Sequence, residues 1–246
     1  MKVVIVIPAR YGSSRFRGKV LANETGKFLI QHTYERALCA KTADKVLIAT
    51  DSDLVMEACK TFGADCVMTS EEHKCGTDRI AEAVENIEAD IIVNLQADEP
   101  EIEPENIDIV AKLLLDNPSA DMATLVTGFD SAEQVENPNV VKAVVDNNGR
   151  ALYFSRSIVP YNRDAGGVGD VSGYLRHLGI YAYRKDFLLE ITQRQQTAWE
   201  ISEKLEQLRA LEYGYTIMAA KVAQACEGID TPEQYAAFVK RINRNK

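Results

Sequence analysis

The chain has 246 residues with 28 Lys or Arg and 37 Asp or Glu, so its formal net charge is −9. This acidity argues against nucleic acid as the main partner, because a duplex favours a broad basic face. Five scattered cysteines form no zinc or disulfide framework, and no apolar run is long enough for membrane insertion. The chain passes from Lys2 into an apolar segment without a signal-peptide pattern, so we expect a cytoplasmic protein.

Apolar segments rich in β-branched residues alternate with helical patterns through the first half of the chain. The pattern predicts strands at 2–7, 45–50, 65–68 and 90–95. It predicts helices at 28–40, 52–62, 77–88 and 104–116. Strands that are apolar on both faces and alternate with helices indicate an α/β fold with a doubly wound, mostly parallel sheet. Such sheets bind ligands outside the carboxyl ends of their strands.

The pattern changes after about residue 120. Strands are predicted at 122–127, 140–145, 152–155 and 178–183, with a turn at Asn147-Asn148-Gly149. A helix at 200–213, a strand at 215–222 and a final helix at 231–243 return to the α/β style. Thr231 and Pro232 are suited to the N-cap and first position of that last helix. We therefore predict one domain, 1–246, with a small β-rich annex at about 125–185.

A basic turn follows the first predicted strand. Its cationic residues are Arg10, Arg15, Arg17 and Lys19. Backbone N–H groups after the strand-end residues Pro8 and Ala9 would cradle phosphate oxygens, and the cations would neutralise them. The glycine spacing matches neither a Walker loop nor the dinucleotide motif. The alternative is an ordinary solvated basic turn, and the turn alone does not decide between the two.

Two acidic residues far apart in the sequence are candidates for one metal site. Asp98 follows a buried strand, with Gln96 just before it, and Asp230 lies just before the last helix. Carboxylates at this edge of a sheet suit Mg²⁺, which takes its other ligands from water and phosphates. Alternatively, Asp98 caps a turn and Asp230 is an acid favoured by the helix dipole. With the basic turn, the pair would form a site for metal-assisted transfer at a phosphate.

Three further segments carry weaker signals. Cys75-Gly76-Thr77-Asp78-Arg79 opens a helix, so Arg79 would face a base or phosphate, while Thr77 would equally be an N-cap. His177 lies in a polar setting, although a lone histidine is more often structural than catalytic. Glu206 and Arg209 are spaced as an ordinary surface pair on a helix.

Together these segments resemble the CMP-Kdo synthetase (3-deoxy-manno-octulosonate cytidylyltransferase) family, colinearly over nearly the whole chain. The matching motifs are 7–15, 76–79, 151–156, 177–181, 205–209 and 228–232. The resemblance implies a homodimer with the Rossmann-like nucleotide-diphospho-sugar transferase fold. It also implies Mg²⁺-dependent transfer of CMP from CTP to the anomeric hydroxyl of an acidic eight-carbon sugar, with release of pyrophosphate, for lipopolysaccharide biosynthesis.

The resemblance also implies roles for individual residues. The catalytic residues would be Arg10, Arg15, Lys19 and Asp98. The nucleotide would contact Pro8, Ala9, Arg10, Arg15, Lys19, Cys75 and Arg79. The sugar would be surrounded by Gln96, Arg163, His177, Glu206 and Gln207. The metal would be held by Asp98 and Asp230. No side chain in these motifs stands out as a general base.

The sequence departs from the family pattern at several positions. Arg17, Val20, Ala97 and Cys75 replace a proline, a second proline, a glycine and a serine of the usual motifs. A Pro-Ser-Pro-Leu-Glu stretch is absent before the sugar-binding helix, where Thr197-Ala198-Trp199-Glu200 stands instead. Two alternatives therefore stay open, namely transfer to 8-amino-Kdo or another acidic sugar, and a CTP-binding homologue without catalysis.

Overall fold

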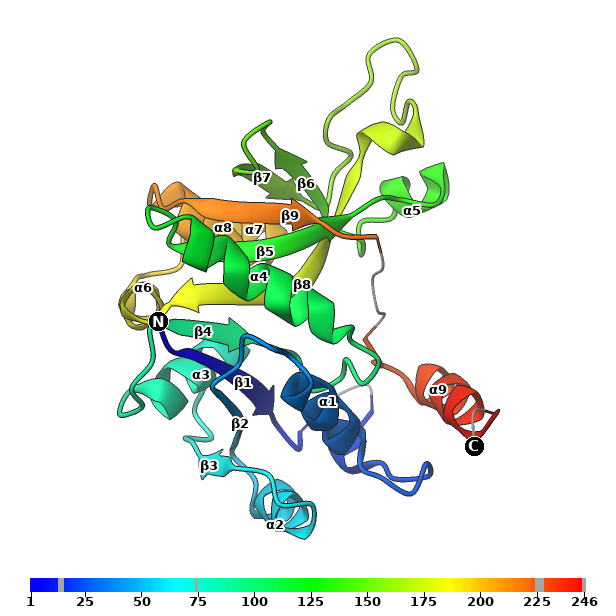
Figure 1. Cartoon of the computed structure of the whole chain (residues 1–246). Coiled ribbons are helices and arrows are strands. Elements are labelled where there is room, and N and C mark those ends of the chain that lie inside the picture. The colour runs from blue at the N-terminus through cyan, green and yellow to red at the C-terminus, as the bar shows by residue number, and fades with distance from the viewer. Residues whose placement is uncertain (13–15, 74, 224–227, 245–246) are drawn as a thin grey trace. The chain divides into compact units, whose positions relative to one another are not determined.

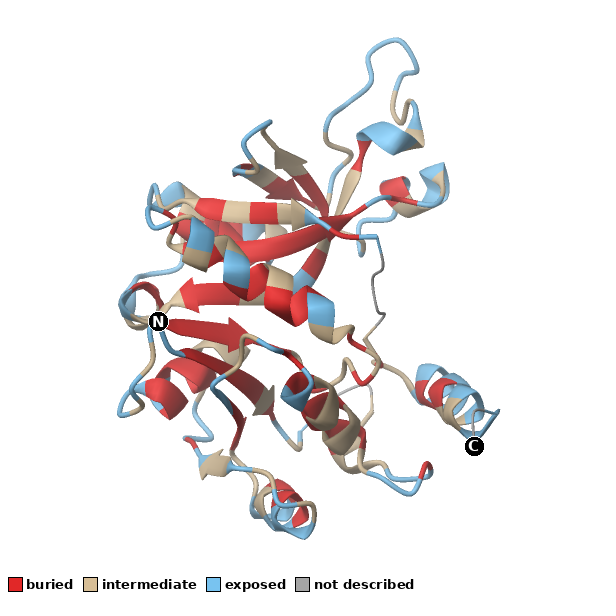
Figure 2. Ribbon diagram, viewed as in Figure 1, coloured by how far each residue is buried: buried red, intermediate tan, exposed pale blue. Residues whose placement is uncertain are grey.

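The computed structural model describes residues 1–12, 16–73, 75–223 and 228–244, which form two compact units (Figure 1). The first unit contains residues 1–108 and the C-terminal segment from residue 226, and the second contains residues 109–225. Helix α4 (Pro104–Asp116) begins in the first unit and continues into the second. In both units, burial is concentrated on the strands and on one side of most helices (Figure 2).

The first unit is built around four parallel strands in the order β3-β2-β1-β4. Its strands are β1 (Val3–Ala9), β2 (Lys45–Thr50), β3 (Cys66–Met68) and β4 (Ile91–Asn94). Its helices are η1 (Lys19–Leu21), α1 (Leu29–Leu38), α2 (Asp53–Thr61), α3 (Gly76–Val84) and α9 (Pro232–Arg244). With this strand order, right-handed crossovers place α1 and α2 on one face of the sheet and α3 on the other.

Burial explains why the central strands of this unit read as continuous apolar segments. Ile5 and Ile7 of β1 and Ile91 and Ile92 of β4 are fully buried. Parallel strands covered by helices on both faces have no solvent-facing side, so their side chains do not alternate in polarity. The carboxyl ends of β1 and β4 lie next to each other, since Leu95 donates its backbone N–H to the carbonyl of Val6 over 3.1 Å. The residues that follow these two strands therefore share one edge.

The second unit has a mixed sheet. Its strands are β5 (Met122–Thr127), β6 (Lys142–Val145), β7 (Ala151–Ser155), β8 (Leu175–Arg184) and β9 (Ile217–Lys221). Its helices are α5 (Ala132–Glu136), η2 (Val171–Gly173), α6 (Lys185–Gln193), α7 (Ala198–Glu203) and α8 (Gln207–Glu212). Strand β5 pairs in parallel with β9 and antiparallel with β8, and β6 pairs antiparallel with β7 and β8.

The predicted turn between β6 and β7 is confirmed. Gly149 has a φ of 81° and donates its N–H to the carbonyl of Asp146 over 3.1 Å. The predicted N-cap of α9 is also confirmed, because the Thr231 hydroxyl accepts the N–H of Gln234 over 3.3 Å. The prediction of one domain with an annex at 125–185 stays a prediction.

The prediction of a single helix at 200–213 is wrong. Helices α7 and α8 are separate, and Lys204 between them adopts a left-handed φ of 54°. The carbonyl of Glu203 at the end of α7 accepts Arg156 Nε over 2.6 Å. This long-range contact satisfies a carbonyl at the helix end, where it has no partner within the helix. Periodicity does not reveal such a contact. Helices α5 and α6 were not predicted either.

Candidate active site

The basic turn after β1 closes on itself. Gly18 donates its N–H to the carbonyl of Tyr11 over 3.1 Å, and it has a φ of 69°. A Cβ added to Gly18 would lie 3.1 Å from the Tyr11 ring, so the position favours glycine on both counts. Phe16 packs on Tyr235 of α9, with ring centroids 5.7 Å apart. This closure brings the chain into η1, whose first residue is Lys19. Arg15 lies outside the described residues.

Lys19 joins the two acids that the sequence singled out for a metal site. Its Nζ lies 2.6 Å from Asp98 Oδ2 and 2.9 Å from Asp230 Oδ1, and it also donates to the carbonyl of Ile229 over 2.9 Å. The Lys19 side chain is only 12% exposed, whereas those of Asp98 and Asp230 are 25% and 39% exposed. The two carboxylates therefore converge on one cation, and both remain partly open to solvent.

Backbone hydrogen bonds hold Asp98 in this position. The Thr33 hydroxyl, which is fully buried on α1, donates to the carbonyl of Ala97 over 3.1 Å. Ile229 donates its N–H to the carbonyl of Asp98 over 2.8 Å. These bonds connect α1, the segment after β4 and the segment before α9. They explain how residues about 130 positions apart in the sequence reach the same cation.

Helix α9 fixes the second acid through an apolar contact. Ile229, Tyr235 and Phe238 form a buried cluster with Leu29 of α1. The Tyr235 hydroxyl also accepts the backbone N–H of Glu24 over 2.9 Å. The C-terminal segment is thereby packed against the N-terminal part of the first unit, and Asp230 lies just before the helix that makes this contact.

The start of α3 lies beside the end of β1. A Cβ added to Gly76 would lie 3.3 Å from Pro8 Cγ, so the close approach favours glycine at this position. The Sγ of Cys75 accepts the N–H of Asp78 over 3.5 Å, which makes Cys75 the N-cap. The interpretation of Thr77 as N-cap is therefore wrong. Pro8, Ala9 and Cys75, all predicted to contact a nucleotide, come together at this edge, where Arg10 is exposed.

Arg79 lies one turn into α3 and is 3% exposed. Its guanidinium donates to Asp51 Oδ2 and to the Thr69 hydroxyl, each over 2.5 Å. These contacts tie α3 to the segments that follow β2 and β3. The predicted contact between Arg79 and a nucleotide stays a prediction, and the structure gives this arginine a stabilising role as well.

Replacing Arg79 with methionine is expected to lower the free energy of unfolding by about 3 kcal/mol, because it leaves a largely buried Asp51 without its cation. Urea unfolding followed by circular dichroism measures the change. The matched control is Lys60→Met, which removes an exposed pair with Glu57 and should change stability little. Equal stabilities of the Arg79 variant and the parent would contradict the stabilising role.

In the second unit, His177 is held between aromatic rings and a hydroxyl. Its ring centroid lies 4.9 Å from that of Phe154 and 5.4 Å from that of Tyr181. Its Nε2 lies 3.0 Å from the Thr124 hydroxyl oxygen. Burial lowers the pKa of His177 to about 3. The imidazole is therefore neutral near pH 7, which makes it a hydrogen-bonding group and not a cation.

This lowered pKa makes a prediction for stability. In the unfolded chain His177 binds a proton below about pH 6.5, while in the folded chain it resists protonation down to about pH 3. Between these two pKa values the unfolded state binds more protons than the folded state. The contribution of His177 to the free energy of unfolding is therefore lost as the pH falls, by at most about 1.4 kcal/mol per pH unit. His177→Gln should lose less stability than the parent between pH 7 and pH 5 in urea titrations. Parallel losses of stability in the variant and the parent would contradict a neutral imidazole in the folded chain.

Gln207, at the start of α8, is 4% exposed and has an unsatisfied amide. Its Oε1 accepts the Tyr181 hydroxyl over 3.3 Å, and its Nε2 is buried with no hydrogen-bond partner. Buried donors in native proteins are nearly always paired, so this amide is suited to a ligand. Glu206, the preceding residue, is exposed.

A buried ion pair supports α8. Glu200 of α7 is 2% exposed and accepts Arg209 Nε and Nη2 over 2.8 and 2.6 Å. Burial acts to raise the pKa of Glu200, but the hydrogen bonds and charge of Arg209 outweigh it and leave that pKa lowered. Arg209 therefore pairs with Glu200, which the spacing of Glu206 and Arg209 did not predict.

The remaining predicted sugar residues lie apart along the chain. Arg163 is exposed in the loop between β7 and β8. Gln96 belongs to the first unit, where its Nε2 donates to Asn94 Oδ1 over 3.1 Å. Two contacts were not predicted from the sequence. The carbonyl of Ile229 accepts a hydrogen bond from Lys19, and the Tyr181 hydroxyl donates one to Gln207. The only sequence signal for the second contact was the tyrosine at the end of the 177–181 motif, which follows the buried residue Ile180.

The carboxylate pair fits the chemistry of a magnesium site. Mg²⁺ is held in proteins by one or two carboxylates, with phosphates and water completing the shell. Asp98 and Asp230 supply such a pair, and they already surround a cationic group. Over the described ranges no group of three or more His, Cys, Asp or Glu residues converges, so a closed all-protein cage is absent there.

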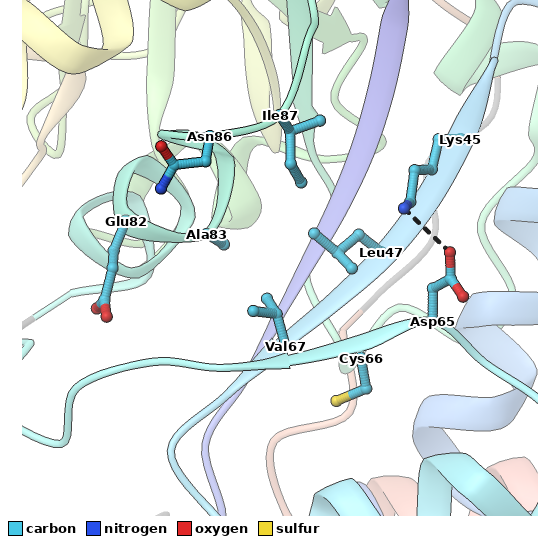
Figure 3. A pocket seen from close by; sticks show the side chains of 9 residues that line it. All are labelled: Lys45, Leu47, Asp65, Cys66, Val67, Glu82, Ala83, Asn86 and Ile87. Atoms are coloured by element: carbon cyan, nitrogen blue, oxygen red, sulfur yellow. Dashed lines mark ion pairs between the residues drawn. The ribbon is translucent and has the colours of Figure 1, made fainter.

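A surface pocket of about 430 Å³ lies over β2, β3 and α3 (Figure 3). Lys45 and Asp65, paired over 3.1 Å, lie at the beginnings of β2 and β3, and none of the predicted site residues lines the pocket. Nucleotides bind parallel sheets at the opposite, carboxyl edge. The candidate active site is therefore the group formed by Lys19, Asp98 and Asp230, here called the Lys19 cluster, and not this pocket.

Similarity to known proteins establishes the family of the chain. Residues 4–218 match a family described as "Cytidylyltransferase". The 3-deoxy-manno-octulosonate cytidylyltransferase of Pelobacter propionicus is 48% identical over 98% of both chains. That of Syntrophus aciditrophicus is 45% identical, over 96% of this chain and 95% of its own. The chain belongs to the 3-deoxy-manno-octulosonate cytidylyltransferase family.

The chain has the same fold as solved structures of cytidylyltransferases. A CMP:2-keto-3-deoxy-manno-octonic acid synthetase complexed with CTP is 42% identical and matches over 100% of both chains, with a TM-score of 0.93. A cytidylyltransferase from Leptospira borgpetersenii, 19% identical with a TM-score of 0.66, shares the fold. The predicted α/β fold with a mostly parallel sheet is confirmed, as is the resemblance to the family. In the described part of the chain, every helix is too short or too polar to cross a membrane.

Proposed function

We propose that this protein transfers CMP from CTP to the anomeric hydroxyl of 3-deoxy-manno-octulosonate (Kdo) and releases pyrophosphate. The hydroxyl oxygen forms a bond to the α-phosphorus, the bond from that phosphorus to the bridging oxygen breaks, and the hydroxyl proton is lost. The product is the activated sugar, which serves lipopolysaccharide biosynthesis in the family that the chain belongs to.

The observation that carries the proposal is the convergence of Asp98 and Asp230 on the Lys19 ammonium, at 2.6 and 2.9 Å. Both acids come from the ends of elements in a parallel α/β unit, where ligands bind. The basic turn and the start of α3 lie at the same edge and would receive the triphosphate. Family membership supports CTP as the nucleotide.

We assign Mg²⁺ to Asp98 and Asp230, whose carboxylates have the donor chemistry that this ion prefers. When bound, it would neutralise phosphate charge and lower the pKa of the sugar hydroxyl. In the structure the Lys19 ammonium pairs with both carboxylates. In the nucleotide complex Mg²⁺ would take its place there, and the ammonium would contact phosphate oxygens. Arg10 and Arg15 would then offset the charge that builds on the leaving pyrophosphate.

His177 is not suited to act as the general base. A general base works best with a pKa near the working pH, and burial lowers the pKa of His177 to about 3. Its role is to orient the sugar. We assign the same kind of role to Gln96, Arg163, Glu206 and Gln207, and the buried Nε2 of Gln207 is the strongest support for this group.

The test is pyrophosphate release from CTP in the presence of Mg²⁺ across a panel of acidic sugars. We expect turnover with Kdo, and the panel includes 8-amino-Kdo and a sialic acid. The Thr197–Glu200 segment, which departs from the family pattern, motivates this choice. Turnover with another sugar and silence with Kdo would overturn the assigned substrate and leave the reaction class in place.

Calorimetry separates the enzyme from a binding protein. CTP binding without turnover on any sugar would support a non-catalytic homologue and contradict the proposed reaction. A homodimer, implied by the family resemblance, stays a prediction, and so does a cytoplasmic location, expected from the scattered cysteines and the lack of a signal-peptide pattern. Sedimentation equilibrium of the purified chain measures the first of these directly.

A further inference from the structure

We infer that the Thr124 hydroxyl fixes the tautomer of His177, keeping a proton on Nε2 and leaving Nδ1 as a hydrogen-bond acceptor for a sugar hydroxyl. Thr124 is a positioning residue in this account, because it acts on the sugar through the imidazole. The sugar contact rests on the proposed function, whereas the tautomer does not.

The origin of this arrangement is an irregularity in the pairing of β5 with β8. Thr124 pairs with Tyr181, and the next residue, Leu125, pairs with Leu178. One step along β5 thus corresponds to three along β8, so Gly179 and Ile180 are extra residues in β8. Bulges of this kind occur next to functional sites, where they redirect side chains.

The bulge brings two carbonyls to a single hydroxyl. Thr124 is fully buried, and its Oγ1 lies 2.8 Å from the carbonyl oxygen of Ile180 and 3.1 Å from that of Leu178. A hydroxyl has one proton, and a carbonyl oxygen only accepts. If that proton pointed elsewhere, three oxygens with lone pairs would face each other in a buried space. The Thr124 proton is therefore committed to a carbonyl.

This commitment determines what Thr124 offers to His177. The imidazole Nε2 lies 3.0 Å from Oγ1, and the hydroxyl has only a lone pair left for it. Nε2 must then carry the proton. A neutral imidazole has one protonated nitrogen, so Nδ1 is the acceptor. The burial that lowers the pKa of His177 to about 3 keeps the ring neutral.

The tautomer limits which group of the ligand His177 can bind. An acceptor nitrogen pairs with a hydroxyl or an ammonium group and repels a carboxylate. The nearby Gln207 has the opposite character, since its Oε1 is occupied by the Tyr181 hydroxyl and its Nε2 is a free buried donor. The two side chains therefore present one acceptor and one donor, which suits a polyhydroxylated sugar better than a second anion.

The experiment is a long-range ¹H–¹⁵N correlation spectrum of the full chain with ¹⁵N-labelled histidine at pH 7. His177→Gln identifies the His177 signals by their loss. We expect the parent to show a protonated Nε2 and a bare, pyridine-type Nδ1. A proton on Nδ1, or on both nitrogens, overturns the inference whatever the enzyme assays give.

Two variants test the role of the hydroxyl. Thr124→Val should lose the single-tautomer signature and raise KM for Kdo about tenfold while KM for CTP changes less than about twofold. Thr124→Ser should keep the parent spectrum. The matched control is Thr127→Val on the same strand, because the Thr127 hydroxyl donates to the carbonyl of Val222 over 2.9 Å.

The outcomes separate the two proposals. An unchanged His177 spectrum in Thr124→Val overturns the role of the hydroxyl. Absence of turnover with Kdo in the parent contradicts the proposed function alone, because the tautomer is read without substrate. If Thr124→Val does not fold, the parent and Thr124→Ser spectra still decide the tautomer.

Discussion

Asp98→Asn is expected to reduce turnover by about a thousandfold or more, with the fold intact. The asparagine keeps the size of the side chain and its hydrogen bond to Lys19, but it removes the charge that would hold Mg²⁺. The backbone bonds from Thr33 and Ile229 to this segment involve main-chain oxygens, so they survive the substitution. Pyrophosphate release at saturating CTP and Kdo measures the loss.

The control for this variant is Glu103→Gln. Glu103 lies on the same connection after β4 and pairs with Arg36 over 2.7 Å, whereas Lys19 pairs with Asp98 and Asp230. The Glu103→Gln variant should retain near-normal turnover. Near-normal turnover of Asp98→Asn would remove Asp98 from the metal site.

Lys19→Ala is expected to raise KM for CTP about 10- to 100-fold while KM for Kdo changes little, because charged hydrogen bonds to phosphate are lost. The same variant leaves Asp98 and Asp230 facing each other without their shared cation. Two neighbouring carboxylates attract a divalent ion more strongly once a competing ammonium is gone. Mg²⁺ alone should therefore raise the melting temperature of Lys19→Ala more than that of the parent.

Lys27→Ala is the matched control, since Lys27 forms an exposed pair with Glu35 in the same unit. It should leave both KM values and the Mg²⁺ response unchanged. Equal effects of Lys19→Ala on CTP and on sugar would contradict the assignment of Lys19 to the phosphates.

The sequence predicted the parts of the fold that depend on local pattern. The central strands of the first unit are continuous apolar segments because both faces of the sheet are covered there, and this pattern is visible in the sequence alone. Asn147-Asn148-Gly149 and Thr231-Pro232 are short signals whose turn and cap chemistry is also local. Asp98 was predicted to bind a metal because it follows a buried strand, and Asp230 because it lies just before the last helix; the structure brings both acids to Lys19.

What the sequence did not reveal depends on contacts distant along the chain. The break at Lys204 is stabilised by Arg156, 48 residues away, which also donates to the carbonyl of Lys204. The ion pair between Arg209 and Glu200 follows from the packing of two short helices. Thr124 was not singled out from the sequence, because its partners lie on a bulge of β8 that periodicity does not predict.

The most direct test of the central claim is a crystal structure with CTP, in which Mn²⁺ replaces Mg²⁺ and is located by its anomalous scattering. We expect one Mn²⁺ peak in contact with the carboxylates of Asp98 and Asp230, and the triphosphate in contact with Lys19 and Arg10. A metal peak bound to other residues, or a triphosphate away from the basic turn, would contradict the proposed active site.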